Sequence, residues 1–301
     1  MININAFGSC ANDYAGTGTG QCPIDQLGDF LGEGLLNKGT SLDIATDTLN
    51  EATFRALIAN GKLHQLLDRE AFEQATPDNE LYTSPEGLIR SIRAGKPQFS
   101  ITYSKGLCFH KAIYKLQGNN KYDHIFYFTK GMLMATNTAG TKLKGFNGGE
   151  FMVGTYMFQQ GTEIEKGKAT FQLKDAEEFN TRWVFMPYDV LGFSPLEIDG
   201  VIETVVKIDP ISAGTTIVLD LVDGCNSSIS YADLFDSVGN WVFTKNGSVI
   251  TPSAVAIVGG KLSFTVSALI ATDVITVVMD GILADDNGLM YKSNTGTKTV
   301  A

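Results

Sequence analysis

The sequence predicts a mainly β protein with two domains, residues 1–196 and 197–301. The first is expected to be an α+β domain, with a β-sheet or barrel and one principal helix, and the second a β-sandwich. Three observations predict this. From Phe99 onward many short runs alternate apolar and polar residues with a period of two. Only one segment carries a full set of helix signals. In the last third, turn residues recur about every 8–12 residues.

The composition is that of a folded protein, because 44% of its residues are hydrophobic and 10% are aromatic. A chain of 301 residues is long enough for two domains with separate cores. No apolar run approaches the roughly 18 residues that a membrane-spanning helix needs. The first residues, MININAFGSC, lack the basic and then apolar pattern of a secretory signal. We therefore expect the chain to fold in a cytoplasm.

The charge is acidic and unevenly distributed. The chain holds 33 acidic and 23 basic residues, a net charge of −10, of which residues 197–301 contribute −7. Wrapping nucleic acid or binding an anionic membrane requires clusters of Lys and Arg, so this balance argues against both. It suits a surface that DNA can pass without binding.

The full set of helix signals lies in TLNEATFRALIANGK, residues 48–62. Thr48 and Glu51 have the three-residue spacing of a capping box. Asn60-Gly61 suits the left-handed conformation that ends many helices. We expect the principal helix of the first domain here.

The next two segments predict shorter helical pieces. KLHQLLDREAFEQA, residues 62–75, has apolar residues at helical spacing and predicts a second helical piece that ends at Pro77. Residues 76–98 are rich in turn residues, and a short helix is expected around Glu86–Arg93.

Residues 99–188 predict a β-sheet with one or two helices. GLCFHKAIYKLQG, residues 106–118, has the pattern of a short amphipathic helix. The expected strands are Phe99 to Tyr103, two strands around Lys130-Gly131 within residues 123–140, and residues 149–158, 168–175 and 181–188.

Near Ser194-Pro195 aromatic residues become rarer, and Val, Ile, Thr, Ser, Gly and Asp take over. Asn246-Gly247 predicts a two-residue hairpin turn, because both residues tolerate positive φ. The pattern is typical of an immunoglobulin-like β-sandwich with Trp241 in its core. Its expected strands lie at residues 201–209, 215–223, 240–252, 261–268, 273–281 and 288–296.

The loop CANDYAGTGTGQC, residues 10–22, could bind a phosphate or a metal, close a disulfide, or have no chemical role. It lacks the lysine of a P-loop and the strand-to-helix context of a dinucleotide-binding loop. We expect a flexible or lumen-facing loop, because glycine supplies backbone freedom and threonine neutral polarity.

The four cysteines, at positions 10, 22, 108 and 225, are spaced too widely and irregularly for a zinc site. Free thiols are the default in a reducing compartment. A disulfide between Cys10 and Cys22 stays open as the alternative.

Other candidate ligands have simpler interpretations as packing or turn residues. His64, His110 and His124 form no pair at i, i+4, and the i, i+2 spacing of Cys108 and His110 separates them on a helix. The sequence DDNG at residues 285–288 lacks the EF-hand spacing and predicts a turn, with a weak calcium site left open. A solvated or inter-subunit polar face is expected where lysines flank Glu163, Glu165, Glu177 and Glu178.

The motif search points away from catalysis. The chain has no nucleophile elbow, HExxH motif, kinase signature or dinucleotide-binding fingerprint. The sequence therefore predicts a protein that is not an enzyme, with no catalytic, cofactor-binding or metal-binding residues and no cofactor.

Two stretches resemble virion structural proteins of tailed phages: TLNEATFRALIANGKLHQL at residues 48–66 and IFYFTKGMLMATNTAGTKLKGFNGGEFMVGTYMF at residues 125–158. The resemblance covers about residues 1–190. A β-rich domain with one principal helix and an acidic immunoglobulin-like module is most similar to the major tail tube proteins of long-tailed phages. No segment matches that family's inner-barrel hairpin residue by residue.

The resemblance implies a homo-oligomer, with hexameric rings that stack into a tube and strands of each subunit joined in an inner barrel. Loops and an N-terminal arm would bridge the rings, the sandwich would decorate the outside, and DNA would pass through without specific binding. The implied partners are other copies and other virion proteins, with no membrane. The implied location is the virion, after synthesis in the cytoplasm of a bacterial host.

Three other functional interpretations stay open: a capsid decoration or head-fibre protein, a carbohydrate-binding surface module, and an enzyme. Self-assembly at high concentration distinguishes the tube subunit from a protein that binds only capsids or glycans.

Overall fold

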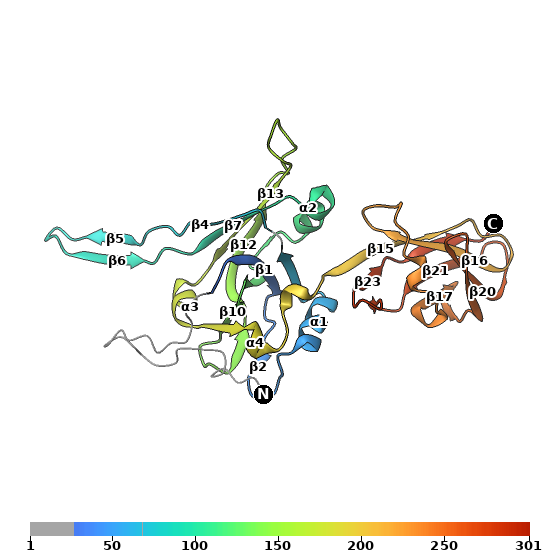
Figure 1. The fold of residues 1–301 in the computed structure, drawn as a ribbon, viewed down its shortest axis with the longest axis horizontal. Coiled ribbons are helices and arrows are strands. Elements are labelled where there is room, and N and C mark those ends of the chain that lie inside the picture. The colour runs from blue at the N-terminus through green and yellow to red at the C-terminus, as the bar shows by residue number, and fades with distance from the viewer. Residues whose placement is uncertain (1–26, 68) are drawn as a thin grey trace. The chain divides into compact units, whose positions relative to one another are not determined.

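A computed structural model describes residues 27–67 and 69–301, and the chain is mainly β, as predicted (Figure 1). The chain divides into two compact units, Met1–Ile198 and Asp199–Ala301. The sequence put the boundary two residues earlier. Ile198 is only 2% exposed, and the 3-10 turn Pro195–Glu197 directly precedes it. The end of the first unit is therefore held by burial as well as by chain connectivity.

The first unit contains an antiparallel sheet, sheet A, in the order β3-β1-β9-β10-β14. The short strands β11 and β2 extend it beside the end of β10. The bounds are β1 Phe30–Asn37, β2 Leu42–Asp43, β3 Leu63–Leu67, β9 Tyr122–Phe128, β10 Gly131–Thr136, β11 Lys142–Lys144 and β14 Trp183–Pro187. The two strands expected around Lys130-Gly131 are confirmed as β9 and β10.

A second antiparallel sheet, sheet B, has the order β12-β13-β7-β4, with β8 beside β12. The bounds are β4 Ala71–Gln74, β7 Gln98–Tyr103, β8 Gly118–Asn119, β12 Phe146–Val153 and β13 Gly167–Leu173. Strand β12 joins the two sheets, because Phe146 and Asn147 pair with β9 while Phe151 to Val153 pair with β13.

The core of the first unit lies between sheets A and B and is rich in phenylalanine. The Phe99 ring lies 5.1 Å from Phe126 and 5.2 Å from Phe171, measured between ring centroids. Aromatic residues bury large areas and add favourable ring contacts, so this cluster stabilises the contact between the sheets. Strand β7 alternates in burial along its length, with Phe99, Ile101 and Tyr103 inside.

One acidic side chain is buried in this core. Glu33 on β1 has no exposed surface, and its Oε2 lies 3.1 Å from Nδ1 of His124 on β9. The His124 ring stacks on Phe171 at 4.2 Å. Burial raises the pKa of the Glu33 carboxyl, and the contact with His124 opposes that rise. Strand β1 was not predicted, because its residues are buried along both faces and give no alternating pattern.

Helix α1, Glu51–Ala59, confirms the principal helix but not its predicted cap. The Asn50 side chain, rather than that of Thr48, accepts the hydrogen bond from the Thr53 N–H. Gly61 has a φ of +63°, as the left-handed ending requires. Phe54 packs on the face of sheet A opposite the core, with its ring 6.5 Å from Tyr127. A Cβ on Gly34 would lie 2.5 Å from the Tyr127 hydroxyl, so glycine makes room for that tyrosine.

Three more helices are present among the described residues of the first unit: α2 Gly106–Lys115, α3 Ala176–Thr181 and α4 Tyr188–Leu191. Helix α2 confirms the amphipathic helix that the sequence predicts. The other two are about one to two turns long and leave no periodic signal in the sequence.

The helical piece predicted for residues 62–75 is wrong. These residues form β3 and β4, which follow one another at the edges of sheets A and B. Leu63 and Leu66, three residues apart, have the spacing of one helix face, but in β3 they lie on opposite faces of the strand and both are buried. Pairing with β1 and β7 selects the strands, as tertiary contacts often override local propensity.

The short helix predicted around Glu86–Arg93 is also wrong. Strand β5, Glu80–Thr83, pairs with β6, Ile89–Arg93, in an antiparallel hairpin. The turn between them is closed by a hydrogen bond from the Ser84 N–H to the Leu88 carbonyl, 2.8 Å long. Gly87 has a φ of +81°, which this turn requires and a helix does not.

The second unit is a sandwich of two sheets around its own core. The first sheet has the order β19-β20-β16-β15-β23-β22 and the second β18-β17-β21-β24. All pairs are antiparallel except β15 with β23. The bounds are β15 Val201–Ile208, β16 Gly214–Asp223, β17 Trp241–Lys245, β18 Ser248–Ile250, β19 Ala254–Val258, β20 Lys261–Leu269, β21 Val274–Met279, β22 Leu283–Ala284, β23 Met290–Ser293 and β24 Gly296–Thr299.

Trp241 is a core residue of this unit, as predicted, with 5% of its surface exposed. Its Nε1–H donates to the Phe235 carbonyl over 2.9 Å, and its ring meets Phe264 edge-on at 5.9 Å. The predicted hairpin turn is confirmed, since Asn246 and Gly247 have φ values of +53° and +82°. Strands β19, β22 and β24 were not predicted.

Candidate assembly surface

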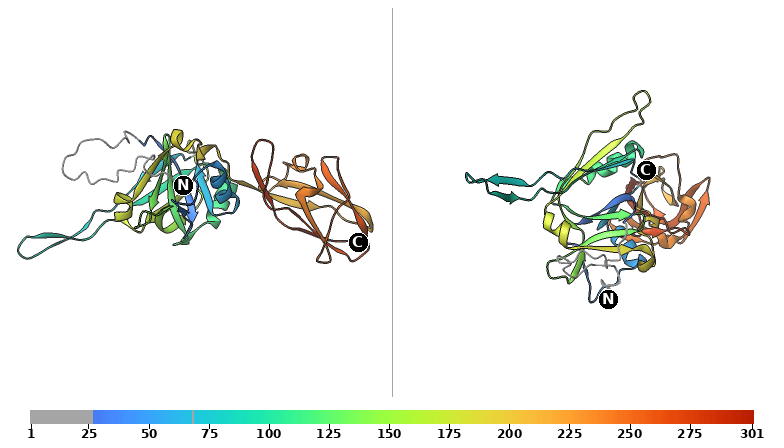
Figure 2. Two further views of the ribbon diagram at one scale, coloured as in Figure 1. Left: turned by 90° about the horizontal axis from the view of Figure 1, so that it is seen from below. Right: turned by 60° about the vertical axis from the view of Figure 1, so that its left-hand side comes forward.

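A long two-stranded ribbon leaves sheet B between β4 and β7 (Figures 1 and 2). We call residues 75–97 the arm. At its base the Ala75 N–H donates to the Gln98 carbonyl over 2.9 Å. Farther out, β5 pairs with β6 alone, and this two-stranded sheet has no third strand among the described residues.

The outer part of the arm is apolar and exposed. Every residue of β5 is exposed, and the large side chains are exposed to 50–67%. An isolated two-stranded hairpin is at best marginally stable in water, and exposed apolar residues on it favour contact with another surface. These side chains are Leu81, Tyr82, Leu88, Ile89 and Ile92.

The neck of the arm is shaped by close backbone contact. A Cβ on Gly95 would lie 1.7 Å from the Pro77 carbonyl oxygen, so no larger residue fits this path of the chain. The Gly95 N–H also donates to Oδ1 of Asn79 over 3.0 Å. These contacts hold the two sides of the arm close together near its base.

A second projection connects β12 to β13, and we call residues 154–166 the β12–β13 loop (Figure 1). It stays ladder-like, with bridges between Met157 and Lys166 and between Gln160 and Glu163. It also carries exposed apolar side chains: Met157 at 51%, Phe158 at 66% and Ile164 at 51%. Both projections thus arise from sheet B, and both carry exposed apolar side chains beside their tips.

A cluster of rings joins α2 to the base of this loop. The Tyr103 hydroxyl lies 2.8 Å from Nδ1 of His110, and the His110 ring lies 5.1 Å from Tyr156. Burial raises the pKa of Tyr103 to about 12 and lowers the pKa of His110. Both shifts favour neutral rings, which suit packing.

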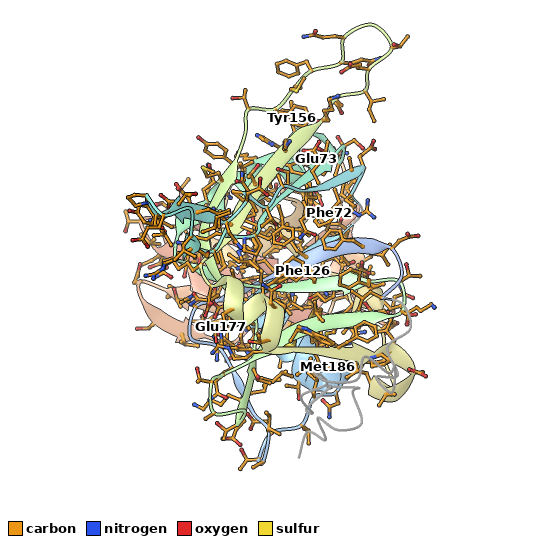
Figure 3. All side chains as sticks on the ribbon, turned by 90° about the vertical axis from the view of Figure 1, so that its left-hand side faces the viewer. Phe72, Glu73, Phe126, Tyr156, Glu177 and Met186 are labelled. Carbon is orange, nitrogen blue, oxygen red and sulfur yellow. The ribbon has the colours of Figure 1, made fainter. Side chains whose placement is uncertain are left out.

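The face of sheet B that points away from the core is polar and close to neutral. Lys168 on β13 pairs with Glu73 on β4 over 2.8 Å, and the Ser100 and Thr170 hydroxyls lie 3.3 Å apart. Phe72, next to Glu73, turns the other way and stacks on Phe30 in the core (Figure 3). Strand β4 has one hydrogen-bonded neighbour within the described residues, so its other edge is open.

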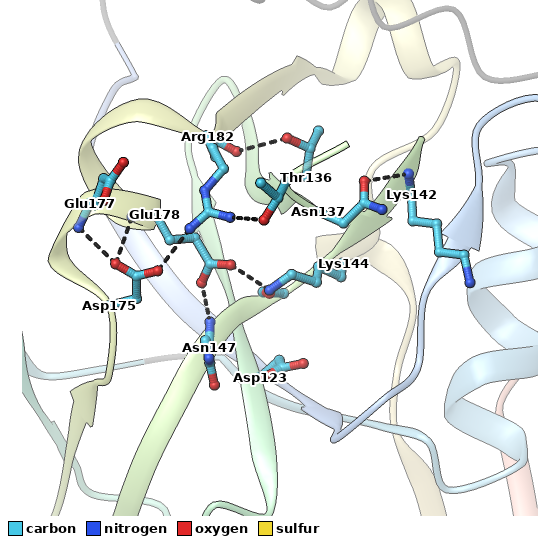
Figure 4. Close-up of polar contacts among 12 residues, drawn as sticks. Asp123, Thr136, Asn137, Lys142, Lys144, Asn147, Asp175, Glu177, Glu178 and Arg182 are labelled. Atoms are coloured by element: carbon cyan, nitrogen blue, oxygen red, sulfur yellow. Dashed lines mark hydrogen bonds and ion pairs between the residues drawn. The ribbon is translucent and has the colours of Figure 1, made fainter. Parts of the chain in front are cut away.

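The point where β12 passes from sheet A to sheet B is fixed by a buried carboxylate (Figure 4). Glu178 on α3 is 3% exposed, pairs with Lys144 over 2.5 Å and accepts the Asn147 N–H over 2.6 Å. The sequence placed Glu178 on a solvated or inter-subunit face, and this is wrong. Nearby, Asp175 caps α3 and pairs with Arg182 over 2.7 Å.

The loop at residues 10–22, with Cys10 and Cys22, lies outside the described residues. Neither Cys108 nor Cys225 is a free thiol, so the prediction of free thiols is wrong for these two. The sequence signal could not reveal this, because pairing depends on distances across the fold.

The three histidines lie apart, each against an aromatic ring: His64 near Tyr122, His110 near Tyr103 and His124 on Phe171. Within residues 27–67 and 69–301, no group of three His, Cys, Asp or Glu side chains could hold a metal ion. Residues 285–288 form a turn, in which Asp285 Oδ1 accepts the N–H groups of Asn287 and Leu289.

In the part of the chain that the structure describes, no helix is long and apolar enough to cross a membrane.

Neither a scan of protein-family models nor a search of curated proteins found a match to this chain.

Proposed function

We propose that this chain is a virion structural protein, a tail tube subunit that assembles into stacked rings through which phage DNA passes. The observation that carries the proposal is the arm. It is a ribbon with exposed apolar side chains and no supporting strand, so it is best explained as one half of a contact between subunits.

Sheet B supports the same proposal. One of its faces packs in the core and the other is polar, with few charges of both signs, including Glu73, Glu150 and Lys168. In a ring, the open edge of β4 would pair with a neighbouring copy, which removes an edge that otherwise invites aggregation. The polar face would then line the lumen. A nearly neutral surface of this kind does not hold DNA phosphates.

The first test is negative-stain electron microscopy of the purified protein, with light scattering on the same sample. Rings or tubes with a central hole are the expected result, and their symmetry gives the copy number. A compact monomer or trimer at every concentration would contradict the tube and favour the capsid decoration alternative, which a capsid-binding measurement then tests.

A matched pair of variants tests the arm itself. Ile89→Asp places a charge on the arm, whereas Val258→Asp does the same at a site of equal exposure in the second unit, 67% against 63%. Losing one apolar contact of about 1.5–3 kcal/mol per subunit should raise the concentration needed for assembly about tenfold or more. The Val258 variant should assemble as the parent does. If both variants assembled equally well, the arm would not be a contact between subunits.

A further inference from the structure

We infer that the second unit pairs with the second unit of another copy through the outer face of its four-stranded sheet. The inference does not depend on the ring. It rests on an unusual chemical pattern, because every side chain on that face is Val or Thr.

The centre of the face is a row that crosses all four strands. Val249 on β18 lies opposite Thr244 on β17, Thr244 opposite Thr276 on β21, and Thr276 opposite Thr297 on β24. The Thr244 and Thr276 hydroxyls lie 2.5 Å apart and satisfy each other. Val249, at the end of this row, is 72% exposed.

Rows on either side continue the pattern. Val242 lies opposite Val278, and Val274, 39% exposed, lies opposite Thr299. Among the intervening residues, Phe243 and Ile275 are buried in the core, and the partly buried Lys245 and Lys298 lie opposite Ile275 and so share its side of the sheet. The face therefore carries no charged side chain.

The other sheet of the same sandwich has an ordinary outer face. Lys207 on β15 lies opposite Asp220 on β16, and Lys261 on β20 pairs with Asp209 over 2.8 Å. Charged residues on exposed strands are the usual protection against contact between sheets. The four-stranded sheet lacks that protection, and its edge strand β18 carries the most exposed valine.

Charge decides which partner fits this face. Residues 199–301 hold eleven acidic and five basic residues, so two copies repel one another, and a face without charge adds least to that repulsion. The face offers no Lys or Arg for phosphate groups and no aromatic ring for a sugar. Two flat faces of Val and Thr can stack as packed sheets do, at about 10 Å separation. A second copy is therefore the occupant that this surface fits.

The test uses the full chain with Ile89→Asp, which weakens the arm contact, and measures sedimentation velocity at protein concentrations below those at which this variant assembles. We expect a monomer–dimer equilibrium. Raising the salt from about 0.02 to about 0.5 M should strengthen the dimer, because salt screens the repulsion between acidic bodies. A dimer held together by oppositely charged patches would instead become weaker as the salt concentration rises. A monomer at every concentration and salt level would overturn the inference.

A matched pair of double variants locates the contact. Val249→Lys with Thr297→Lys charges the proposed face, and Thr265→Lys with Ser267→Lys charges exposed positions on β20 in the other sheet. The first pair should raise the dimer dissociation constant about tenfold or more, since like charges would meet across the contact. The second pair should leave it within about twofold, and equal effects of both would overturn the inference.

Two further measurements separate these outcomes from misfolding and from the tube proposal. Thermal unfolding of each variant checks the fold, and Thr297→Val, which keeps the face uncharged, should retain the dimer. Because the dimer is measured with the arm contact weakened, it can persist when microscopy finds no rings, and rings can form when the dimer is absent.

Discussion

Glu33 is an acidic side chain with no exposed surface, and only one of its two oxygens has a hydrogen-bond partner within the described residues. Burial without full pairing disfavours the charged form, which raises the pKa of this carboxyl above its usual value of 4.5. The titratable groups that act on it are His124, in direct contact, and Tyr127. A single residue thus makes the stability of the first unit depend on pH.

The direction of that dependence follows from proton binding. The folded state keeps the Glu33 proton at pH values where the unfolded state has lost it. The stabilisation is complete below pH 4.5 and is lost as the pH rises through the higher folded pKa. We predict that Glu33→Gln flattens the fall in unfolding free energy across this window, measured by urea denaturation at several pH values. Glu150→Gln, at an exposed site, is the control. An unchanged slope in the Glu33 variant would show that another group titrates there.

The burial of Glu33 and Glu178 could not be predicted from the sequence. Glu33 lies opposite Phe126 in β9, and Glu178 pairs with Lys144, 34 residues away. Because both partners are distant in the sequence, no local pattern indicates either pairing. Trp241 and the Asn246-Gly247 turn were predictable, because a tryptophan in a strand and a turn that needs positive φ are decided by local chemistry.

Among the elements, the arm is the one that we expect to contribute least to the stability of the first unit. Its exposed side chains bury little within this chain, and the hydrogen bond between Ala75 and Gln98 brings its two ends together. We predict that replacing residues 76–96 with Asn-Gly, which keeps the Pro97 carbonyl that accepts the Leu173 N–H over 2.9 Å, leaves the melting temperature within a few degrees of the parent. The reason is that a three-residue turn can join paired strands. Differential scanning calorimetry measures this. A large loss of stability would mean that the arm supports the core.

Assembly should respond in the opposite way to the same change. If the arm is half of a subunit contact, its removal abolishes rings while the fold remains. The sequence marked residues 76–98 as rich in turns, with a short helix around Glu86–Arg93, because a ribbon with apolar groups on both faces shows no alternation. The same limit applied to residues 62–75, because β3 is buried on both faces and its leucines therefore keep a helical spacing.

At the scale of the whole molecule, the change in composition near Pro195 corresponds to a change in structure. The first unit has a core of aromatic residues between sheets A and B, and the second has a separate core around Trp241, Phe243 and Phe264. A unit with its own core can fold by itself. This separation divides the two proposed contacts, the arm in one unit and the Val and Thr face in the other.

We predict that a chain ending at Ile198 still folds and assembles. The cut belongs after Ile198 rather than after residue 196, because Ile198 is buried and the Pro195 carbonyl accepts a hydrogen bond from Gln65 over 2.9 Å. Removing a buried isoleucine would cost about 2–5 kcal/mol. A chain ending at residue 196 is therefore the matched comparison, and it should unfold at a lower temperature.

Electron microscopy in a reducing buffer, with circular dichroism on the same samples, distinguishes the possible results. Rings from the 1–198 chain mean that the first unit carries assembly and that the second modulates it from its own face. A folded 1–198 chain that stays monomeric would locate the principal contact in residues 199–301. The Val and Thr face would then be the main assembly surface, and the arm would contact a different virion protein.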